Sequence, residues 1–264
     1  MLELQHVYKT FNQGTINEKK ALQDLNFHLK PGDFVTVIGG NGAGKSTMLN
    51  MIAGVYNTNG GKIILDGKDI TKQPEHIRAK MLGRVFQDPM RGTASDMNIE
   101  ENLAMALRRG QHRGLKWGIT KAERELFIER LITLDLGLET RLKSKVGLLS
   151  GGQRQAITLL MATMKRPQLL LLDEHSAALD PKTAKKVLEL TQEIIDEEKL
   201  SALMVTHNMK DAIKYGNRLI MMNNGSIIYD VEGEEKKNLK VADLLAKFET
   251  ANGEDFANDR MLLS

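Results

Sequence analysis

The sequence predicts an α/β fold with a mostly parallel sheet that helices cover on both faces. Three almost continuous apolar runs, at 34–38, 169–172 and 202–205, are typical of strands buried on both sides. Helical patterns lie between and after them, for example at 184–197, just behind Asp180-Pro181. Because buried strands that alternate with helices need crossover connections, we expect their sheet to be parallel.

Composition and charge narrow the class of protein. The 264 residues contain 41% hydrophobic and 27% charged residues, which excludes a disordered or fibrous chain. The net charge of +3 is too small to indicate nucleic-acid binding by itself. No apolar stretch approaches the roughly 18 residues of a membrane helix, and the first residues do not resemble a signal peptide. Cysteine is absent, which fits a reducing compartment, so we expect a cytosolic globular protein.

Two further segments predict antiparallel strands. Residues 22–30 alternate between apolar and polar side chains, which is typical of a half-exposed strand, and Pro31-Gly32-Asp33 follows as a turn. Near the end, 219–222 and 227–229 flank Asn223-Asn224-Gly225, a strong hairpin signal.

The middle of the chain differs from the rest. From 89 to 150 the pattern is helical, with apolar spacing at 100–107 and 121–136 around a basic loop at 108–117. We expect a helical insertion there, and one more helix with a polar tail from 241 onward.

A glycine-rich motif follows the first buried strand and precedes a helix. It comprises Gly39, Gly40, Asn41, Gly42, Ala43, Gly44, Lys45 and Ser46, with Thr47 directly after it. Its glycines allow the backbone N–H groups to surround a phosphate chain, and the helix N-terminus adds partial positive charge. Lys45 would then bridge the β- and γ-phosphates, and the Ser46 hydroxyl would ligate Mg²⁺.

A second chemical signal is the acidic end of the strand at 169–172. At the carboxyl end of a sheet next to a phosphate loop, Asp173 can hold Mg²⁺ through water. Glu174 can polarise an attacking water. Alone, this pattern would fit solvated charges equally well; behind the phosphate loop it favours catalysis.

A third motif precedes an apolar helix: Ser150, Gly151, Gly152 and Gln153, after Leu149. Ser150 is a good helix N-cap, and the glycines permit close backbone approach. Alone, the segment would fit an ordinary capped helix, and the other interpretation is a second anion-binding helix terminus. The phosphate loop, this segment and the acidic strand end, in this order, resemble the nucleotide-binding subunit of ATP-binding cassette (ABC) proteins.

Four single positions extend the resemblance, which covers residues 1–230. Gln87 matches the glutamine that senses Mg²⁺ and the γ-phosphate, and His207 matches the switch histidine that contacts the γ-phosphate. Asp180 is the last residue of a short segment that matches the D-loop of the family. Phe11 lies where the family places an aromatic residue that stacks on adenine, with Tyr8 as the less favoured alternative.

The resemblance also implies a fold and a mode of action. The fold is a P-loop NTPase (RecA-like) core with an N-terminal antiparallel β-subdomain and a helical subdomain at about 89–154. Residues 231–264 form an extension that packs on the core or on a dimer mate, or ends as a frayed tail. Two subunits would dimerise around two ATP and Mg²⁺, each ATP between one subunit's loop and the other's Ser150–Gln153, with Glu174 as general base.

The resemblance leaves three classes of function open. We expect the ATPase of a transporter at the cytoplasmic face of a prokaryotic membrane, with a separate permease and an extracytoplasmic binding protein. The alternatives are a membrane ATPase that transmits force, and an ATPase that acts on nucleic acid or ribosomes. The basic loop at 108–117 is the one feature that could contact nucleic acid or anionic lipid, although such a run is more often a solvated loop. The run from Glu174 through His175 to Asp180, with the insert 12–20, resembles an importer subgroup paired with lipoproteins for aromatic amino acids such as tryptophan or tyrosine.

Overall fold

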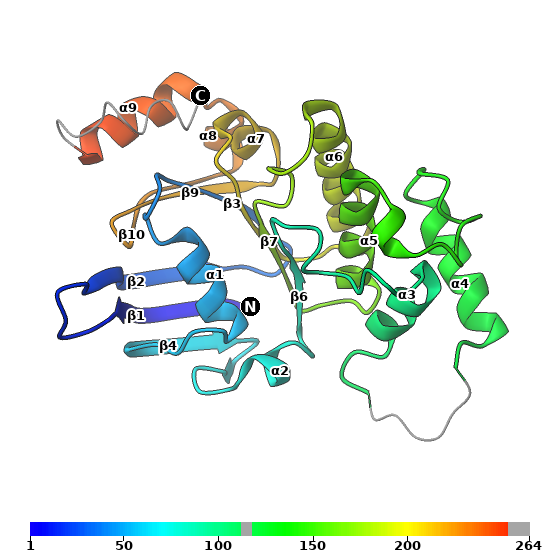
Figure 1. Cartoon of the computed structure of the whole chain (residues 1–264). Coiled ribbons are helices and arrows are strands. Elements are labelled where there is room, and N and C mark those ends of the chain that lie inside the picture. The colour runs from blue at the N-terminus through cyan, green and yellow to red at the C-terminus, as the bar shows by residue number, and fades with distance from the viewer. Residues whose placement is uncertain (112–117, 253–264) are drawn as a thin grey trace. The chain divides into compact units, whose positions relative to one another are not determined.

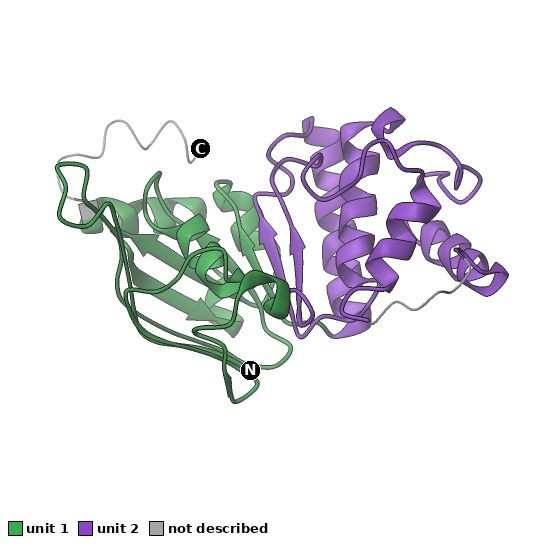
Figure 2. Ribbon diagram, turned by 60° about the horizontal axis from the view of Figure 1, so that its bottom comes forward, with its two compact units in different colours: residues 1–78, 200–264 green, residues 79–199 purple. Residues whose placement is uncertain are grey.

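The structure is a computed structural model that describes residues 1–111 and 118–252. The chain forms two units, shown in different colours in Figure 2. Unit 1 combines residues 1–78 with those from 200 onward, and unit 2 comprises 79–199. Each unit is described by itself below.

Unit 1 is built around the strand β3 (Phe34–Ile38), all five residues of which are buried. Two parallel strands flank it, β8 (Ala202–Val205) and β9 (Arg218–Asn223), and β10 (Ser226–Glu232) runs antiparallel to β9. Burial on both faces explains why the sequence of β3 lacks the alternation of a half-exposed strand.

A second, antiparallel sheet in unit 1 has the strand order β2-β1-β4-β5. Its long strands are β1 (Leu2–Phe11) and β2 (Lys19–Leu29), followed by β4 (Gly60–Leu65) and the short β5 (Lys68–Asp69). In β2, Leu25, Phe27 and Leu29 are buried and alternate with exposed residues, as their spacing predicts. The helices α1 (Lys45–Ala53) and α2 (Glu75–Arg78) complete this part of the unit.

The C-terminal part of unit 1 contains three helices, α7 (Met209–Lys214), α8 (Gly233–Lys237) and α9 (Val241–Asn252) (Figure 1). Leu244 and Phe248 of α9 are buried in an apolar cluster with Ile38 at the end of β3 and Met221 of β9. The buried ammonium of Lys236 donates to the carbonyls of Ile213, Tyr215 and Gly216 at 2.6–2.9 Å. The described part of the C-terminal extension therefore packs on the core of its own unit.

Unit 2 contains the parallel pair β6 (Leu82–Val85) and β7 (Leu169–Asp173), with Val85 opposite Leu172. Its helices are α3 (Ile99–Leu107), α4 (Lys121–Ile132), α5 (Gly151–Thr163) and α6 (Pro181–Glu198), with a 3₁₀ turn η1 (Val146–Leu148) before α5. Among the residues described, none of the helices has the length and apolar character of a membrane span.

Most predicted elements lie where the sequence places them. The three buried strands and the hairpin are present, and so are the helices predicted at 100–107, 121–136, 184–197 and from 241 onward. The hairpin turn has positive φ at Asn224 (47°) and Gly225 (78°), the conformation that favours these residue types. β1 and β4 were not predicted, and β2 begins at Lys19, inside the segment 12–20 that was interpreted as an insert. The predicted limits of the domains remain a prediction.

A buried arginine holds the end of α1 in place. Arg78 is 1% exposed, and its guanidinium donates to the carbonyls of Met51 and Ile52 at 2.6 and 2.9 Å. It also donates to the carbonyls of Gln73 and Thr71. The last turn of a helix has carbonyls without intrahelical partners, so Arg78 satisfies groups that would otherwise be buried without a donor.

We predict that Arg78→Met destabilises the protein by about 3 kcal/mol, because it leaves buried carbonyls without their charged donor. Urea unfolding followed by circular dichroism measures this as a lower midpoint. Arg91→Met, at an exposed position, is the matched control and should change stability by less than about 0.5 kcal/mol. Equal midpoints for the two variants would contradict the role of Arg78.

We predict that Phe248→Ala lowers stability by about 3 kcal/mol, since it opens a cavity in the cluster around Ile38. The neighbouring Glu249 is exposed, so Glu249→Ala should unfold like the wild type. Thermal unfolding compares the two. If both variants melt together with the wild type, α9 contributes nothing to the core.

Candidate functional site

The phosphate loop follows β3 directly and is shaped by a close backbone contact. Gly39 has φ of 151°, and a Cβ placed there would lie 2.2 Å from the carbonyl oxygen of Met222 in β9. No side chain fits that space, so the loop can leave the strand in this direction only with glycine at the position. The motif therefore has a structural reason at its first residue as well as a chemical one.

The helix α1 offers its N-terminal N–H groups without a side-chain cap. Its N-cap is Gly44, and its first turn contains no acidic residue. The helices α3, α4 and α5 instead begin with complete capping boxes. Uncapped N–H groups and the helix dipole favour an anion at this end of α1.

Lys45 supplies the positive charge of this loop. It is 5% exposed, and its ammonium donates to the carbonyls of Gly39 and Gly40 at 2.7 and 3.0 Å. The ammonium is thus held within the loop. Together with the uncapped helix, it makes a cradle that fits the phosphate chain of a nucleotide.

His207 lies at the same edge of the sheet in unit 1. It follows β8, which pairs in parallel with β3, and the Thr206 N–H donates to the carbonyl of Val37 at 3.1 Å. Carboxyl ends of adjacent parallel strands meet at one edge, so the fold brings His207 and the phosphate loop together. Asn208 then caps α7 through the N–H groups of Lys210 and Asp211.

The aromatic candidates at the end of β1 differ in their surroundings. Phe11 packs edge to face on Tyr56, with ring centroids 5.2 Å apart, and the Lys9 ammonium lies 5.1 Å from the Phe11 ring. Tyr8 faces Asp24 instead, whose hydrogen bond and charge raise the pKa of the Tyr8 hydroxyl. That Phe11 rather than Tyr8 stacks on a base stays a prediction.

In unit 2, the ends of β6 and β7 carry the other predicted residues. Asp173 is the last residue of β7 and Glu174 follows it, while Gln87 lies two residues beyond β6. The parallel pairing places these side chains at one edge of unit 2. Glu174 has φ of 48°, a conformation that costs of order 1 kcal/mol for a residue with a Cβ and that occurs often at functional sites.

Arg84 is a charged neighbour that the sequence analysis did not single out. It lies in β6, and its guanidinium is 3.9 Å from a carboxylate oxygen of Asp173. The same guanidinium stacks on the ring of Phe86, 4.5 Å from its centroid. The available signal for this contact was a charged residue close before Gln87.

The segment Ser150–Gln153 begins α5 with a capping box. The Gln153 N–H donates to the Ser150 hydroxyl, and the Ser150 N–H donates to the Gln153 side chain, both at 3.3 Å. A Cβ on Gly152 would lie 2.0 Å from the methyl group of Thr183, so glycine here allows α5 and α6 to approach. Gln155 donates to the carbonyl of Phe86 at 3.1 Å and thereby ties α5 to the segment that carries Gln87.

Asp180 is the N-cap of α6 and accepts the Thr183 N–H at 3.1 Å. The hydrogen bonds from Thr183 lower the pKa of this carboxyl.

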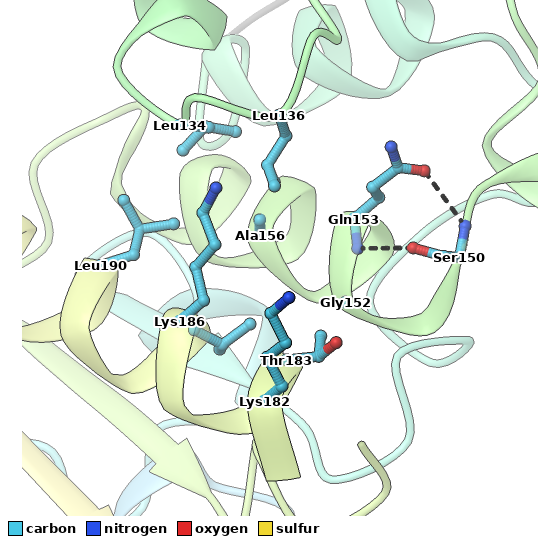
Figure 3. Close-up of a pocket in the computed structure, with 11 residues that line it drawn as sticks. Leu134, Leu136, Ser150, Gly152, Gln153, Ala156, Lys182, Thr183, Lys186 and Leu190 are labelled. Carbon is cyan, nitrogen blue, oxygen red and sulfur yellow. Dashed lines mark hydrogen bonds between the residues drawn. The ribbon is translucent and has the colours of Figure 1, made fainter. Parts of the chain in front are cut away.

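A cavity of about 400 Å³ opens between α5 and α6, close to Asp180 (Figure 3). Ser150 and Gln153 line it, and so do Lys182 and Lys186 of α6. The start of α5 is therefore open on this side within unit 2.

The predicted Mg²⁺ ligands are oxygen atoms, which are the ligands that Mg²⁺ prefers. Among the described residues, no three His, Cys, Asp or Glu side chains gather as a metal site. Mg²⁺ in nucleotide sites is usually held by one or two protein oxygens together with phosphates and water. Unit 1 offers the hydroxyl of Ser46, and unit 2 offers the amide of Gln87 and the carboxylate of Asp173 at the ends of its own strands. That these oxygens bind Mg²⁺ stays a prediction.

Each unit thus gathers one part of the predicted set. Unit 1 holds Phe11, the phosphate loop and His207, and unit 2 holds the other predicted site residues.

The basic loop at 108–117 is described in part. Arg108 forms an ion pair with Glu123, and Arg109 donates to the carbonyl of Lys165. Residues 112–117 of that loop lie outside the described residues.

Comparison with known proteins identifies the family. The model of the ABC transporter family matches residues 22–177. The tyrosine transport ATP-binding protein of Clostridioides difficile is 43% identical over 252 residues, which cover 95% of this chain and all of that protein. The methionine import ATP-binding protein MetN of Corynebacterium jeikeium is 36% identical over 84% of this chain and 58% of its own length.

Solved structures agree with the sequence relatives. A dimeric ATP-binding cassette in a post-hydrolysis state with ADP and Pi superposes with a TM-score of 0.75 and 29% identity, over 88% of this chain and 98% of that one. A nucleotide-free cassette of an ABC transporter gives a TM-score of 0.73 and 27% identity, over 90% and 93%. The predicted P-loop NTPase fold is confirmed, and the chain belongs to the ABC transporter family as an ATP-binding ATPase subunit.

Proposed function

We propose that this chain hydrolyses ATP to drive import of an aromatic amino acid through a separate membrane permease. The observation that carries this proposal is the similarity over the full length to the tyrosine transport ATP-binding protein. The similarity to a methionine importer subunit supports the wider class of amino-acid import. The run from Glu174 to Asp180 and the segment 12–20, noted in the sequence, point to the same subgroup.

We further propose that two copies act together around two ATP, each bound by the phosphate loop of one copy and Ser150–Gln153 of the other. Two features support this arrangement: the cavity that leaves the start of α5 open, and the dimeric cassette among the structural relatives. A γ-phosphate shared by two helix N-termini would make closure of the dimer depend on ATP.

Each residue of the loop has a proposed task. Lys45 would exchange its contacts with the carbonyls of Gly39 and Gly40 for the β- and γ-phosphates. The N–H groups from Gly40 to Thr47 bind phosphate oxygens, and Ser46, Asp173 and Gln87 hold Mg²⁺. Phe11 orients the base by stacking. Bound ATP supplies the phosphoanhydride bond whose cleavage drives the cycle.

Hydrolysis needs a base and a group that steadies the γ-phosphate. Glu174 is the proposed base, because its carboxylate follows the strand that carries Asp173 and can take a proton from water. His207 would donate a hydrogen bond to the γ-phosphate. Asp180, already bound to Thr183, holds the start of α6 and with it the loop behind Glu174.

The permease would contact the segment that follows Gln87, up to Asn102. This assignment places the chain at the cytoplasmic face of the membrane, with an extracytoplasmic binding protein that selects the solute. Two residues of α5 connect to this part of the chain, since Gln155 donates to the carbonyl of Phe86, directly before Gln87, and Arg154 contacts the sulfur of Met90. Movement at the permease could thereby reach Ser150.

We predict that Glu174→Gln slows ATP hydrolysis by about 10²–10⁴-fold, because the amide cannot accept the proton of water. ATP binding should persist, since no phosphate contact is assigned to Glu174. Phosphate release and ATP titration measure the two effects separately. Glu197→Gln, the same change at an exposed position of α6, is the control. Full turnover by Glu174→Gln would remove Glu174 as the base.

We predict that host cells without this chain lose uptake of labelled tyrosine, and that the wild-type chain restores it. Lys45→Ala should not restore uptake, since it removes the ammonium assigned to the phosphates. Methionine uptake in the same cells is the control and should stay unchanged. Normal tyrosine uptake in the deleted cells, with the chain recovered on ribosomes or DNA, would favour the alternative outside transport.

A further inference from the structure

A second lysine lies beside the phosphate loop, outside every motif considered above. Lys19 is the first residue of β2, and its side chain is exposed. A Cβ placed on Gly42 of the loop would lie 3.4 Å from the Lys19 ammonium. We propose that Lys19 binds the phosphate chain of the nucleotide held by this loop, as a second ammonium beside Lys45. This role depends on the phosphate-binding role proposed for residues 39–47.

The position of Lys19 is fixed by the backbone that follows it. A Cβ on Gly44 would lie 2.6 Å from the carbonyl oxygen of Ala21, so β2 passes directly against the loop. Gly225 joins the two segments, because its N–H donates to the Ala43 carbonyl and its carbonyl accepts the Gln23 N–H, both at 3.0 Å. Residues 21–23 are thereby held along the loop, and Lys19 comes two residues before them.

The ammonium of Lys19 forms no ion pair with a carboxylate in the described part of the chain. The nearest carboxylate in the sequence, Glu18, accepts the Gly14 N–H at 2.8 Å. Within residues 1–111 and 118–252, no carboxylate forms an ion pair with Lys19. An exposed ammonium next to a loop built for phosphates has a clear electrostatic preference for that ligand.

The pairing of β1 with β2 places Lys19 close to the proposed partner of the base as well as to the phosphate loop. Lys19 lies directly opposite Phe11, the proposed partner of the base, and opposed residues share one face of a sheet. The same strand pair therefore presents an aromatic ring for the base and an ammonium for the phosphates. Lys20 is opposite Thr10, and its side chain points to the other face.

The test compares Lys19→Ala with Lys20→Ala, two identical changes of charge on adjacent residues. Isothermal titration of the full chain with ADP and with ATP should show about tenfold weaker binding for Lys19→Ala and wild-type binding for Lys20→Ala. Lys19→Arg should keep most of the affinity, because it retains the charge. The dependence of affinity on salt should be weaker for Lys19→Ala than for the wild type.

Adenosine separates a phosphate contact from a structural effect. Displacement of a fluorescent ADP analogue gives the affinity for adenosine, which should be the same in Lys19→Ala and the wild type. Equal weakening for adenosine and ADP would mean that the change disturbs Phe11, and would overturn the proposal. Unchanged ADP affinity in Lys19→Ala would overturn it as well. Failure of the loop assignment itself would appear differently, as full ADP binding by Lys45→Ala.

Discussion

The burial of β3 is the constraint on which the rest of unit 1 depends. Its five residues are buried, and its backbone is bonded to β8 on one side and to β9 on the other. A strand that is buried on both faces and hydrogen-bonded along both edges has little freedom to move, so Ile38 and the loop behind it are held in one position. The contact of Gly39 with the Met222 carbonyl then sets the direction of the loop. The stability of the core and the place of the phosphate cradle are therefore one property.

Unit 2 uses the same principle, since the four leucines of β7 are buried. The pairing of β6 with β7 brings Gln87, Asp173 and Glu174 to one edge, and hydrogen bonds join Gln155 to Phe86 and Thr183 to Asp180. Glu174 has a left-handed backbone conformation, which is unfavourable for a residue with a Cβ. It is tolerated because β7 and the capped α6 fix the chain on both sides. A loop can change its conformation at lower cost than a core can, which would suit the responses to ATP and to a permease that are proposed for these residues.

The sequence was sufficient for features that depend on local pattern. The buried runs, the Asn224-Gly225 turn and the caps at Ser150 and Asp180 follow from neighbouring residues, so they could be predicted. Features that depend on distant residues could not. Gly152 is required by Thr183, and Lys19 acquires its surroundings from Gly42 and Gly225. Roles for Gln87 and His207 came from family resemblance, because a single glutamine or histidine after a strand carries no specific pattern.

Lys45 in the loop and Lys19 beside it would act under different electrostatic conditions. Lys45 is almost fully buried, where water and salt screen its attraction to phosphate only weakly. Lys19 is exposed, so its attraction falls as ionic strength rises and as the Debye length shrinks below about 10 Å. The buried charge can thus fix the phosphate at short range, whereas the exposed charge adds affinity and attracts the nucleotide from solution. Because Lys19 shares a strand pair with Phe11, that added affinity is tied to the orientation in which the base can stack.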